Sequence, residues 1–400
     1  MRRLRLSFSV MLFLVGASAS AQAPAGSVYA DSASSEARFI HRFEADVMHD
    51  AILHTNKFLD GGNRFGRHIN SLPGIALKYG FQFPRQSARA LAYGQPRQGI
   101  GVARHWADKL LGSPLSVFVF QGAQIASLGN RLSADYEWKL GLTTGWETYR
   151  DNRENLVFGS SSTAMMNLSL LLRWRLSRSL DIGLGVEATH FSNGNTRYPN
   201  GGLNTLGGRL SLTYVAGRDD TQDPGTPLTP ARHGLYADLM AYGARCTAGA
   251  PNGNGQLIAL DDTYAVYGLA LAPMYRLSRR FAAGLSLDAV WDRSANIQLM
   301  KKGGQLKPYP HKPDNQFAAG LSAHGEFIMP IFTINAGIGT NVIGAEGDFS
   351  GIYQTLTLKI DIAGPLYANI GYTLHDFSDP DHLMFGLGCR IGRAASKAAR

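Results

Sequence analysis

The residues best suited to catalysis lie close together in one short segment, residues 188–195. This segment contains His190 and Ser192, which are two residues apart. Serine is a weak nucleophile at its own pKa, so nucleophilic chemistry needs an adjacent group, such as an imidazole, to take its proton. Side chains two apart in a β-strand leave the strand on the same face. If this segment is a strand, the hydroxyl and the imidazole are neighbours on one face.

The surrounding pattern predicts such a strand. The face that holds His190 and Ser192 continues an apolar row of Ile182, Leu184, Val186 and Ala188, whereas the other face holds Gly183, Gly185, Glu187 and Thr189. Asn204 lies in the strand that we expect to return beside this one, and it shares the parity of an apolar row that ends at Tyr214. We therefore expect Ser192, His190 and Asn204 to meet on the apolar face of two paired strands.

Alternation with a period of two residues is the main pattern of the whole chain. In residues 132–146 the apolar face reads Leu132, Ala134, Tyr136, Trp138, Leu140, Leu142, Thr144 and Trp146. The other face is polar or small. Similar rows occupy residues 164–176, 281–291, 317–327, 356–362, 366–374 and 383–391. A lipid-facing row beside a lumen-facing row is typical of transmembrane β-strands. A soluble β-sandwich also alternates, but the strand lengths favour a membrane barrel.

The connections between these rows alternate in length. Short links occur at residues 175–179, 277–280, 329–331 and 363–365, and longer links rich in Gly, Asn and Asp occur at residues 149–159, 193–202 and 292–313. Periplasmic turns and extracellular loops of outer-membrane barrels show this pattern. The prediction is an all-β, transmembrane antiparallel β-barrel with an even number of strands, about 14–16. An eight-stranded barrel followed by a second β unit stays open as the alternative.

The first residues indicate export from the cytoplasm. Basic residues among positions 2–5 precede an apolar run at residues 6–15, and Ala19, Ser20 and Ala21 follow. This order is typical of a secretory signal peptide, which we place at residues 1–21. The apolar run is too short for a spanning helix, which needs about 20 residues.

Composition excludes several classes of protein. In the 400 residues, 17% are charged, 10% are aromatic and 46 are glycine, which suits a barrel better than a soluble enzyme. The formal net charge of +9 comes from scattered residues, so we expect an anionic membrane surface as the partner and no nucleic acid. Cys246 and Cys389 form no disulfide framework or metal motif. No metal and no organic cofactor is indicated, and the oligomeric state is left undetermined.

We expect five segments along the chain. Residues 1–21 are the signal peptide, residues 37–217 the first half of the barrel, and residues 218–232, rich in Asp, Pro and Thr, a connecting segment. Residues 233–393 supply further barrel strands, and residues 394–400 form a basic tail.

The segment around His190 resembles the PagL-type outer-membrane lipid A 3-O-deacylases, a family also labelled acyloxyacyl hydrolases. The family motif is His-x-Ser-Asn, then a glycine-containing loop with Pro-Asn, then an acidic residue fourteen positions after the histidine. His190, Ser192, Asn193 and the pair Pro199 and Asn200 fit this motif. Asn204 stands where the family has its acid. Residues 98–101 and 145–146 also look like longer members, and the resemblance covers roughly residues 40–217.

The resemblance implies ester hydrolysis with Ser192 as nucleophile and His190 as general base. Asn204 takes the orienting role, the turn at Asn193 and Gly194 supplies the oxyanion donors, and Arg197 is a candidate for binding lipid A phosphates. Glu187, with the opposite parity, is a weak substitute for the missing acid.

The function expected from this resemblance is 3-O-deacylation of lipid A, in the outer leaflet of the bacterial outer membrane, by a multi-pass barrel. Two other functions stay open. One is a non-catalytic porin or structural barrel, which Asn204 in place of the acid favours. The other is an outer-membrane phospholipase with similar Ser/His chemistry.

Overall fold

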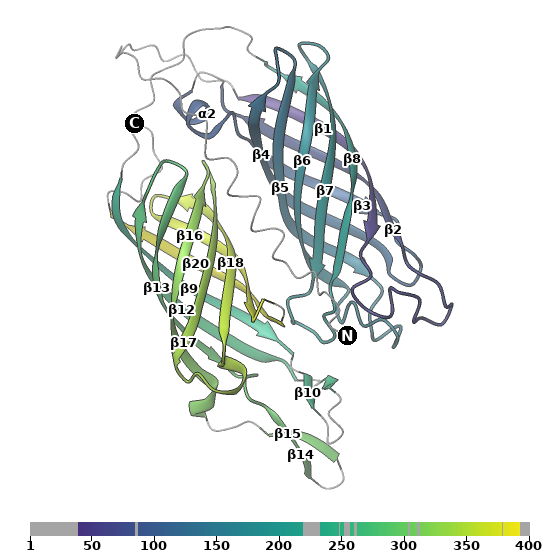
Figure 1. Cartoon of the computed structure of the whole chain (residues 1–400), viewed down its shortest axis with the longest axis vertical. Helices are drawn as coiled ribbons and strands as arrows, with labels where there is room; N and C mark the ends of the chain where they lie inside the picture. The colour runs from purple at the N-terminus through teal and green to yellow at the C-terminus, as the bar shows by residue number, and fades with distance from the viewer. Residues whose placement is uncertain are drawn as a thin grey trace. The chain divides into compact units, whose positions relative to one another are not determined.

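The computed structural model describes residues 39–84, 87–218, 233–247, 249–251, 257–259, 262–302, 305–309, 313–377 and 379–392. The chain divides into two compact units. Each unit contains one closed antiparallel barrel, and both barrels are visible in Figure 1. The expected signal peptide, residues 219–232 of the expected connecting segment and the basic tail lie outside the described residues.

The first barrel is an up-and-down meander in which each strand pairs with the next one along the chain, and β8 closes the ring on β1. Its strands are β1 (Ile40–Ile52), β2 (Ser71–Gln82), β3 (Arg97–His105), β4 (Gly112–Ser127), β5 (Leu132–Trp146), β6 (Ser162–Arg175), β7 (Leu180–Ser192) and β8 (Leu203–Ala216). The helix α2 (Ala88–Tyr93) lies between β2 and β3.

The second barrel has the same plan and is closed by pairing of its last strand with its first. Its strands are β9 (Gly234–Cys246), β12 (Tyr264–Arg276), β13 (Phe281–Asp292), β16 (Phe317–Ile328), β17 (Phe332–Ile343), β18 (Ile352–Ala363), β19 (Leu366–His375) and β20 (Asp379–Ile391). The connections contain a small hairpin of β10 (Gly249–Pro251) with β11 (Leu257–Ala259), another of β14 (Gln298–Lys302) with β15 (Gln305–Tyr309), and the 3₁₀ turns η2 (Pro313–Gln316) and η3 (Gly347–Phe349).

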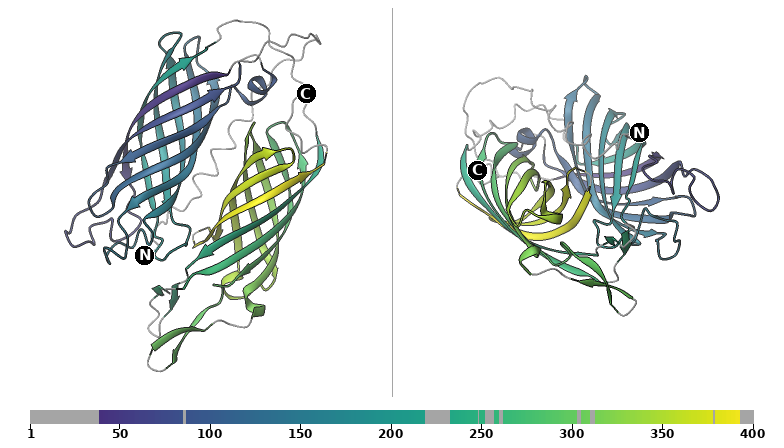
Figure 2. Two further views of the ribbon diagram at one scale, coloured as in Figure 1. Left: turned by 180° about the vertical axis from the view of Figure 1, so that it is seen from behind. Right: turned by 60° about the horizontal axis from the view of Figure 1, so that its bottom comes forward.

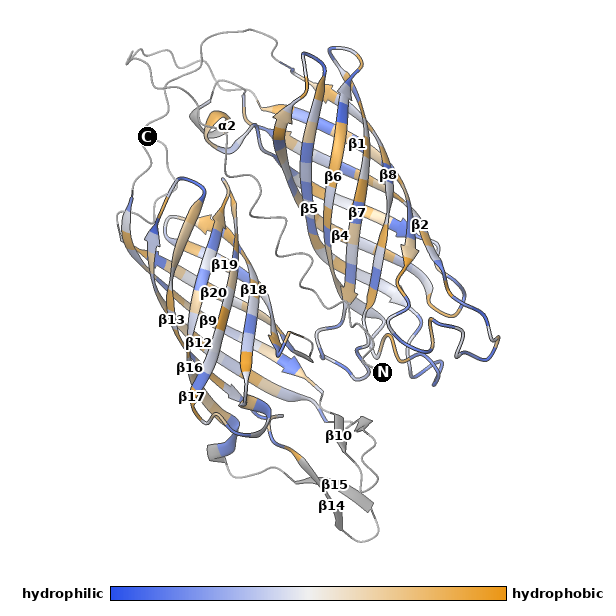
Figure 3. Ribbon diagram, in the orientation of Figure 1, coloured by the Kyte–Doolittle hydropathy of each residue, from blue (hydrophilic) through white to orange (hydrophobic). Residues whose placement is uncertain are grey.

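These sequences form barrel strands because one face of each strand is apolar and the other is polar or small. Strand β1 alternates strictly between buried and exposed positions. Exposed apolar side chains form the outer surface of both barrels, for example Leu184, Leu210, Leu269 and Leu387. Apolar residues recur along the strands in Figure 3, and Figure 2 shows the strands of each barrel tilted in the manner of a closed sheet. An apolar exterior of this kind suits a lipid environment.

Charged side chains fill much of the interior of the first barrel. Lys78 lies 2.5 Å from Glu44, 3.0 Å from Asp46 and 2.8 Å from Glu137, and Arg209 lies 2.7 Å from Glu137. Further ion pairs of the same lumen join Lys139 with Glu187, Arg173 with Asp135, Arg97 with Asp135 and Arg42 with Asp181. Each charge in this network has a partner of opposite sign, so the loss of one member leaves an uncompensated buried charge.

An apolar plug closes the end of the first barrel at which β1, β3, β5 and β7 finish. We define this apolar plug as the buried cluster that includes Phe58, Leu59, Trp146, Phe158 and Phe191. The connections at this end are residues 53–70, 106–111, 147–161 and 193–202, whereas two of those at the other end are the short turns 128–131 and 176–179. The exception at the short end is the connection that contains α2. The predicted alternation of link lengths is therefore present.

Trp146 is one residue whose predicted face was wrong. Strict alternation places it on the outer row of β5, but its side chain is buried in the apolar plug, and its indole N–H donates to Thr163 Oγ1 at 2.9 Å. The backbone N–H groups of Gly145 and Trp146 both donate to Ser161 O, at 3.0 and 3.3 Å. Two residues that oppose one form a β-bulge, and Gly145, with φ +100°, accommodates it. The bulge shifts the parity by one residue and turns Trp146 inward.

The fold class is confirmed as all-β with antiparallel barrels of even strand number. Of the two architectures left open by the sequence, the structure has the eight-stranded barrel followed by a second β unit, which is itself a barrel of eight. Within the described residues, no helix is long and apolar enough to cross a membrane.

Candidate active site

Ser192, His190 and Asn204 lie on adjacent strands at the end of the first barrel that carries the apolar plug. His190 in β7 lies directly opposite Asn204 in β8, and Ser192 lies opposite Ala164 in β6. On β7 the inward row is Asp181, Gly183, Glu187, Thr189 and Phe191. His190 and Ser192 therefore belong to the outer row, and the same alternation places Asn204 on the outer row of β8.

The imidazole of His190 is oriented by Asn204. His190 Nδ1 lies 2.6 Å from Asn204 Oδ1. An amide oxygen only accepts hydrogen bonds, so in this contact Nδ1 carries the proton and donates it. In the neutral ring Nε2 is then the basic nitrogen. The contact selects the tautomer that a general base acting through Nε2 requires.

Two buried residues beside the site residues, Phe191 and Leu203, hold the backbone at the rim of the barrel in place. Phe191, which separates His190 from Ser192, points into the apolar plug and is fully buried. Its ring lies 5.1 Å from that of Trp146. Leu203, which pairs with Phe191 and precedes Asn204, is fully buried in the same plug. The apolar plug holds the inward side chains in place, so the backbone between them is fixed. The outward side chains therefore leave the strand in defined directions.

Ser192 is only 4% exposed although it belongs to an outer row. The connection after it is pinned to the β5–β6 connection, since Gly201 N–H donates to Leu156 O at 3.1 Å and Gly202 N–H donates to Val157 O at 3.2 Å. Backbone contacts of this kind hold residues 201–202 close to the rim.

Gly202 packs directly against the histidine, a contact that sequence reasoning missed. It has φ +64°, and a Cβ placed on it lies 3.2 Å from His190 Cε1. Any side chain here is strained by the backbone and also crowds the ring. In the sequence, the signal for this contact was a glycine that follows Pro199 and Asn200. The spacing does not show that this glycine packs against His190, twelve residues earlier.

The other predicted residues have separate positions. Asn193 follows Ser192 directly and is buried. Gly194, with φ +60°, and the exposed Arg197 follow in the β7–β8 connection. The oxyanion and phosphate-binding roles of these three residues stay predictions.

Glu187 is unavailable as an acid for His190. Its carboxylate lies inside the barrel, 3.1 Å from Lys139 Nζ and 3.6 Å from Arg209 Nη1. The opposite parity that made it a weak substitute in the sequence is present in the structure. Asn204 is thus the residue that the described structure places on His190 Nδ1.

A closed barrel with an apolar exterior and a rim group of Ser, His and Asn defines a membrane β-barrel with the residue set of a hydrolase. Two family models match the chain: "Lipid A 3-O-deacylase (PagL)" over residues 106–213, and "Acyloxyacyl hydrolase, C-terminal domain" over residues 236–393. The chain belongs to this family of lipid A deacylases and is a hydrolase. The predicted family and enzyme class are confirmed. The second match extends the family to the half of the chain for which the resemblance implied no role.

Several solved structures have some similarity to the chain. The outer-membrane enzyme PagL shares 17% identity, with a TM-score of 0.28, over 42% of this chain and 97% of that one. A mutant of the ferric enterobactin receptor from Pseudomonas aeruginosa shares 10% identity over 83% of this chain and 67% of that one, with a TM-score of 0.24. A mutant of a Rh. blastica porin shares 7% over 88% and 100%, with a TM-score of 0.16. None of the curated proteins compared with the chain matches its sequence.

Proposed function

We propose that this lipid A deacylase hydrolyses the 3-O-acyl ester of its substrate with Ser192 as nucleophile and His190 as general base. The observation that carries the proposal is the 2.6 Å contact between His190 Nδ1 and Asn204 Oδ1 on the outer row that also holds Ser192. This contact prepares Nε2 to accept a proton.

The reaction proceeds in two halves. His190 Nε2 takes the proton of Ser192 Oγ as this oxygen attacks the ester carbonyl, and a tetrahedral oxyanion forms. When the intermediate collapses, the sugar hydroxyl leaves with the proton from His190 and the acyl chain stays on Ser192. Water, activated by the same imidazole, then hydrolyses the acyl-serine to a free fatty acid.

Stabilisation of the oxyanion is assigned to the turn at Asn193 and Gly194. Each backbone or side-chain donor aimed at a developing oxyanion contributes about 2.7–4 kcal/mol. Arg197 is exposed and can pair with a phosphate of lipid A through charge-assisted hydrogen bonds.

Asn204 orients His190 but carries no charge to stabilise the imidazolium. In serine proteases, Asn in place of the triad Asp costs about 10⁴ in turnover, largely because it favours the wrong tautomer. Here the amide oxygen faces Nδ1, so the tautomer is the productive one. We therefore expect a slower enzyme than an acidic residue gives, and not an inactive one.

The outward position of the site supports a membrane lipid as the substrate. The barrel crosses the membrane with eight strands, and its outer rows near the site are apolar, with Leu206 on β8 following Asn204 and Met166 on β6 following Ala164. An acyl ester in the outer leaflet approaches this outer row from the side and stays in the bilayer.

The direct experiment compares lipid A from cells that express the wild type, Ser192→Ala or Ser162→Ala. Ser162 is a matched control, because it is an exposed serine on the neighbouring strand β6. We expect mass spectra to show loss of one 3-hydroxyacyl chain with the wild type and Ser162→Ala, and intact lipid A with Ser192→Ala. Identical spectra for the wild type and Ser192→Ala contradict the proposal.

An assay with purified protein distinguishes the proposed lipid A deacylase from a phospholipase. We expect the detergent-solubilised wild type to release fatty acid from lipid A and not from glycerophospholipid vesicles. The reverse preference overturns the assigned substrate while leaving the Ser/His chemistry intact.

A further inference from the structure

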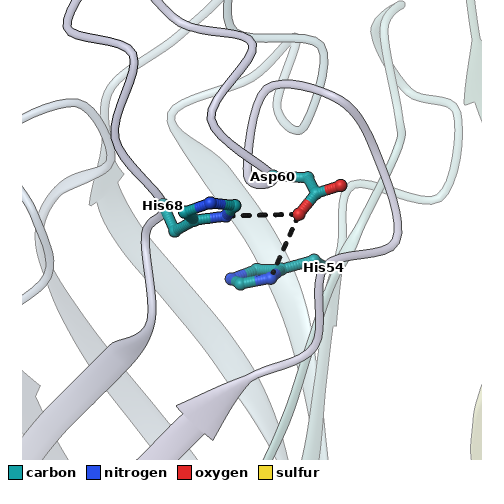
Figure 4. A group of neighbouring side chains, drawn as sticks. All are labelled: His54, Asp60 and His68. Carbon is teal, nitrogen blue, oxygen red and sulfur yellow. Dashed lines mark ion pairs between the residues drawn. The ribbon is translucent and has the colours of Figure 1, made fainter.

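Two histidines and an aspartate converge in the β1–β2 connection of the first barrel, outside the residues assigned to ester hydrolysis. They are His54, Asp60 and His68, and Figure 4 shows both imidazole rings turned toward one carboxylate. His68 Nδ1 lies 3.2 Å from Asp60 Oδ1, and His54 Nδ1 lies 3.6 Å from the same oxygen. We propose that these three side chains bind a divalent transition-metal ion, with Zn²⁺ as the best fit.

The spacing of the ligand atoms suits a tetrahedral ion. Nitrogen and oxygen ligands lie about 2.0–2.2 Å from Zn²⁺, so neighbouring ligands of a tetrahedron are about 3.3–3.6 Å apart. The two separations from the carboxylate oxygen, 3.2 and 3.6 Å, are close to this range, and all three ligand atoms lie within 4.8 Å of one another.

A carbonyl group fixes which nitrogen of His54 faces the metal position. His54 Nε2 lies 3.1 Å from Ile69 O, and since a carbonyl only accepts, Nε2 carries a proton there. In the neutral ring the lone pair is then on Nδ1, and it faces the acceptor oxygen of Asp60. Either a second proton on Nδ1 or a metal ion satisfies these two acceptors, and the Zn²⁺ titration described below distinguishes the two. Metal-binding histidines in proteins are commonly oriented by such an outer hydrogen bond on the other nitrogen.

The connection that carries the ligands is anchored before any ion binds. Asp60 follows Leu59 and His68 precedes Ile69, and both apolar side chains are buried in the apolar plug. Ile69 N–H donates to Leu59 O at 3.0 Å, and Asp60 and His68 form an isolated antiparallel bridge. The ligand positions are thus held by the barrel core, which reduces the ordering that metal binding requires.

Solvent reaches this cluster. The side chains of His54, Asp60 and His68 are 27%, 53% and 56% exposed. Three protein ligands leave the fourth position of Zn²⁺ for water or another ligand, as in open zinc sites. Two imidazoles and one carboxylate suit Zn²⁺ better than Ca²⁺ or Mg²⁺, which take oxygen ligands.

The metal cluster adjoins the rim that carries the ester-hydrolysis residues. Leu53, the residue before His54, donates its N–H to Asn204 O at 2.9 Å. An ion that holds His54 therefore also restrains the backbone next to Asn204. The site is a separate one, because His54, Asp60 and His68 are distinct from the residues that we assign to catalysis.

The test measures Zn²⁺ binding directly. The full chain, without a polyhistidine tag, is refolded in detergent, dialysed against a chelator and titrated with ZnCl₂ by calorimetry. We expect saturable binding that loses one equivalent, or weakens at least about ten-fold, in His54→Ala and in His68→Ala, since loss of even an outer-shell partner costs about 10–100-fold. Affinity should rise with pH, because protons and the metal compete for the same nitrogens.

His41→Ala is the matched control, because His41 is an exposed histidine at the other end of β1. It should bind Zn²⁺ like the wild type. Asp60→Asn keeps the shape of the side chain, so it decides the question if a histidine variant fails to fold. The absence of saturable binding in the wild type, or equal binding in the wild type, His54→Ala, His68→Ala and Asp60→Asn, overturns the proposal.

Discussion

Both barrels contain a serine and a histidine two residues apart in one strand and an asparagine on the next strand. In the first barrel His190 and Ser192 lie on β7 and Asn204 lies on β8. In the second barrel Ser322 and His324 lie on β16 and Asn335 lies on β17. There His324 Nδ1 lies 2.9 Å from Asn335 Oδ1, and Nε2 lies 2.8 Å from Ser322 Oγ. By residue type alone, both groups qualify as hydrolase sites.

The face of the sheet separates the two groups. Ser322 is buried in the lumen of the second barrel, where its Oγ donates to Asp288 at 2.5 Å, and Tyr353 donates to the same carboxylate oxygen at 2.7 Å. The cavity lined by His324 and Asn335 has a volume of about 60 Å³, which is room for a few water molecules and not for an acyl chain. A serine whose proton is committed to Asp288 is also a poor nucleophile. The comparison teaches that strand parity, more than residue type, distinguishes the two groups: Ser192 belongs to an outer row, whereas Ser322 faces the lumen.

Replacing the two histidines tests this difference with the largest expected effect. We expect His190→Ala to lower kcat at least about 10³-fold, because the variant loses the general base of the proposed mechanism. His324→Ala should keep wild-type activity, since it affects the inward group alone. The measurement is fatty-acid release from lipid A by purified protein. Equal losses in the two variants contradict the assignment of catalysis to the first barrel.

The charged interiors are a second point on which the barrels are alike. Arg209 contacts Glu137 at 2.7 Å in the first barrel, and Lys359 contacts Asp238 and Glu326, both at 2.6 Å, in the second. Removing one partner of a buried pair leaves an uncompensated charge and costs about 3–5 kcal/mol. Arg209→Met and Lys359→Met should each lower stability by this amount in urea titrations of the detergent-folded protein.

Arg131→Met is the control for these two variants, because Arg131 is exposed in a turn of the first barrel. It should be unchanged within the error of the titration. A stability loss in only one of the two barrel variants breaks the parallel between the interiors and identifies the barrel that limits unfolding.

Alternation in the sequence predicted the clearly patterned strands and the shared outer face of His190, Ser192 and Asn204. Parity placed His190 and Asn204 on one outer surface, and the structure pairs them directly. Ring closure was not predictable in this way. Parity is the same whether β8 pairs with β1 or continues into β9, and the structure has the β8–β1 pairing.

Local irregularity also limits what alternation can predict. The bulge at Gly145 turns Trp146 from the outer row into the apolar plug. A pattern with a fixed period of two does not contain the position of an extra residue. Contacts from connections, such as Gly202 against His190, depend on how a loop folds back over the rim and have no signature in spacing.

Replacing the asparagine of each group tests the comparison with a smaller expected effect on kcat. Asn204→Ala removes the acceptor at His190 Nδ1, so we expect kcat to fall about 10²-fold, the lower end of what a positioned general base contributes. Asn335→Ala should leave kcat unchanged. Asn204→Asp restores a charge beside the imidazole and should raise kcat and shift its pH profile to higher pH. An unchanged pH profile in Asn204→Asp is inconsistent with the orienting role of Asn204.

Two glycines that pack against the two histidines give the finest test. A Cβ on Gly202 lies 3.2 Å from His190 Cε1, and a Cβ on Gly337 lies 2.6 Å from His324 Cε1. Gly202→Ala should lower kcat about ten-fold, because a displacement of about 1 Å near a reacting group can cost as much as 10²-fold and this contact needs only a few tenths of an ångström. Gly337→Ala should lower stability and spare kcat.

Backbone strain at Gly202 is the competing cause, since its φ of +64° costs an alanine about 1–2 kcal/mol. Gly66→Ala isolates that cause, because Gly66 has φ +62° and nothing within 4 Å of its Cβ position. If Gly66→Ala loses stability but keeps kcat, whereas Gly202→Ala loses both, the loss of kcat comes from the displaced imidazole. Equal kcat in all three variants means that the position of His190 tolerates the crowding, and the contact with Gly202 has no part in catalysis.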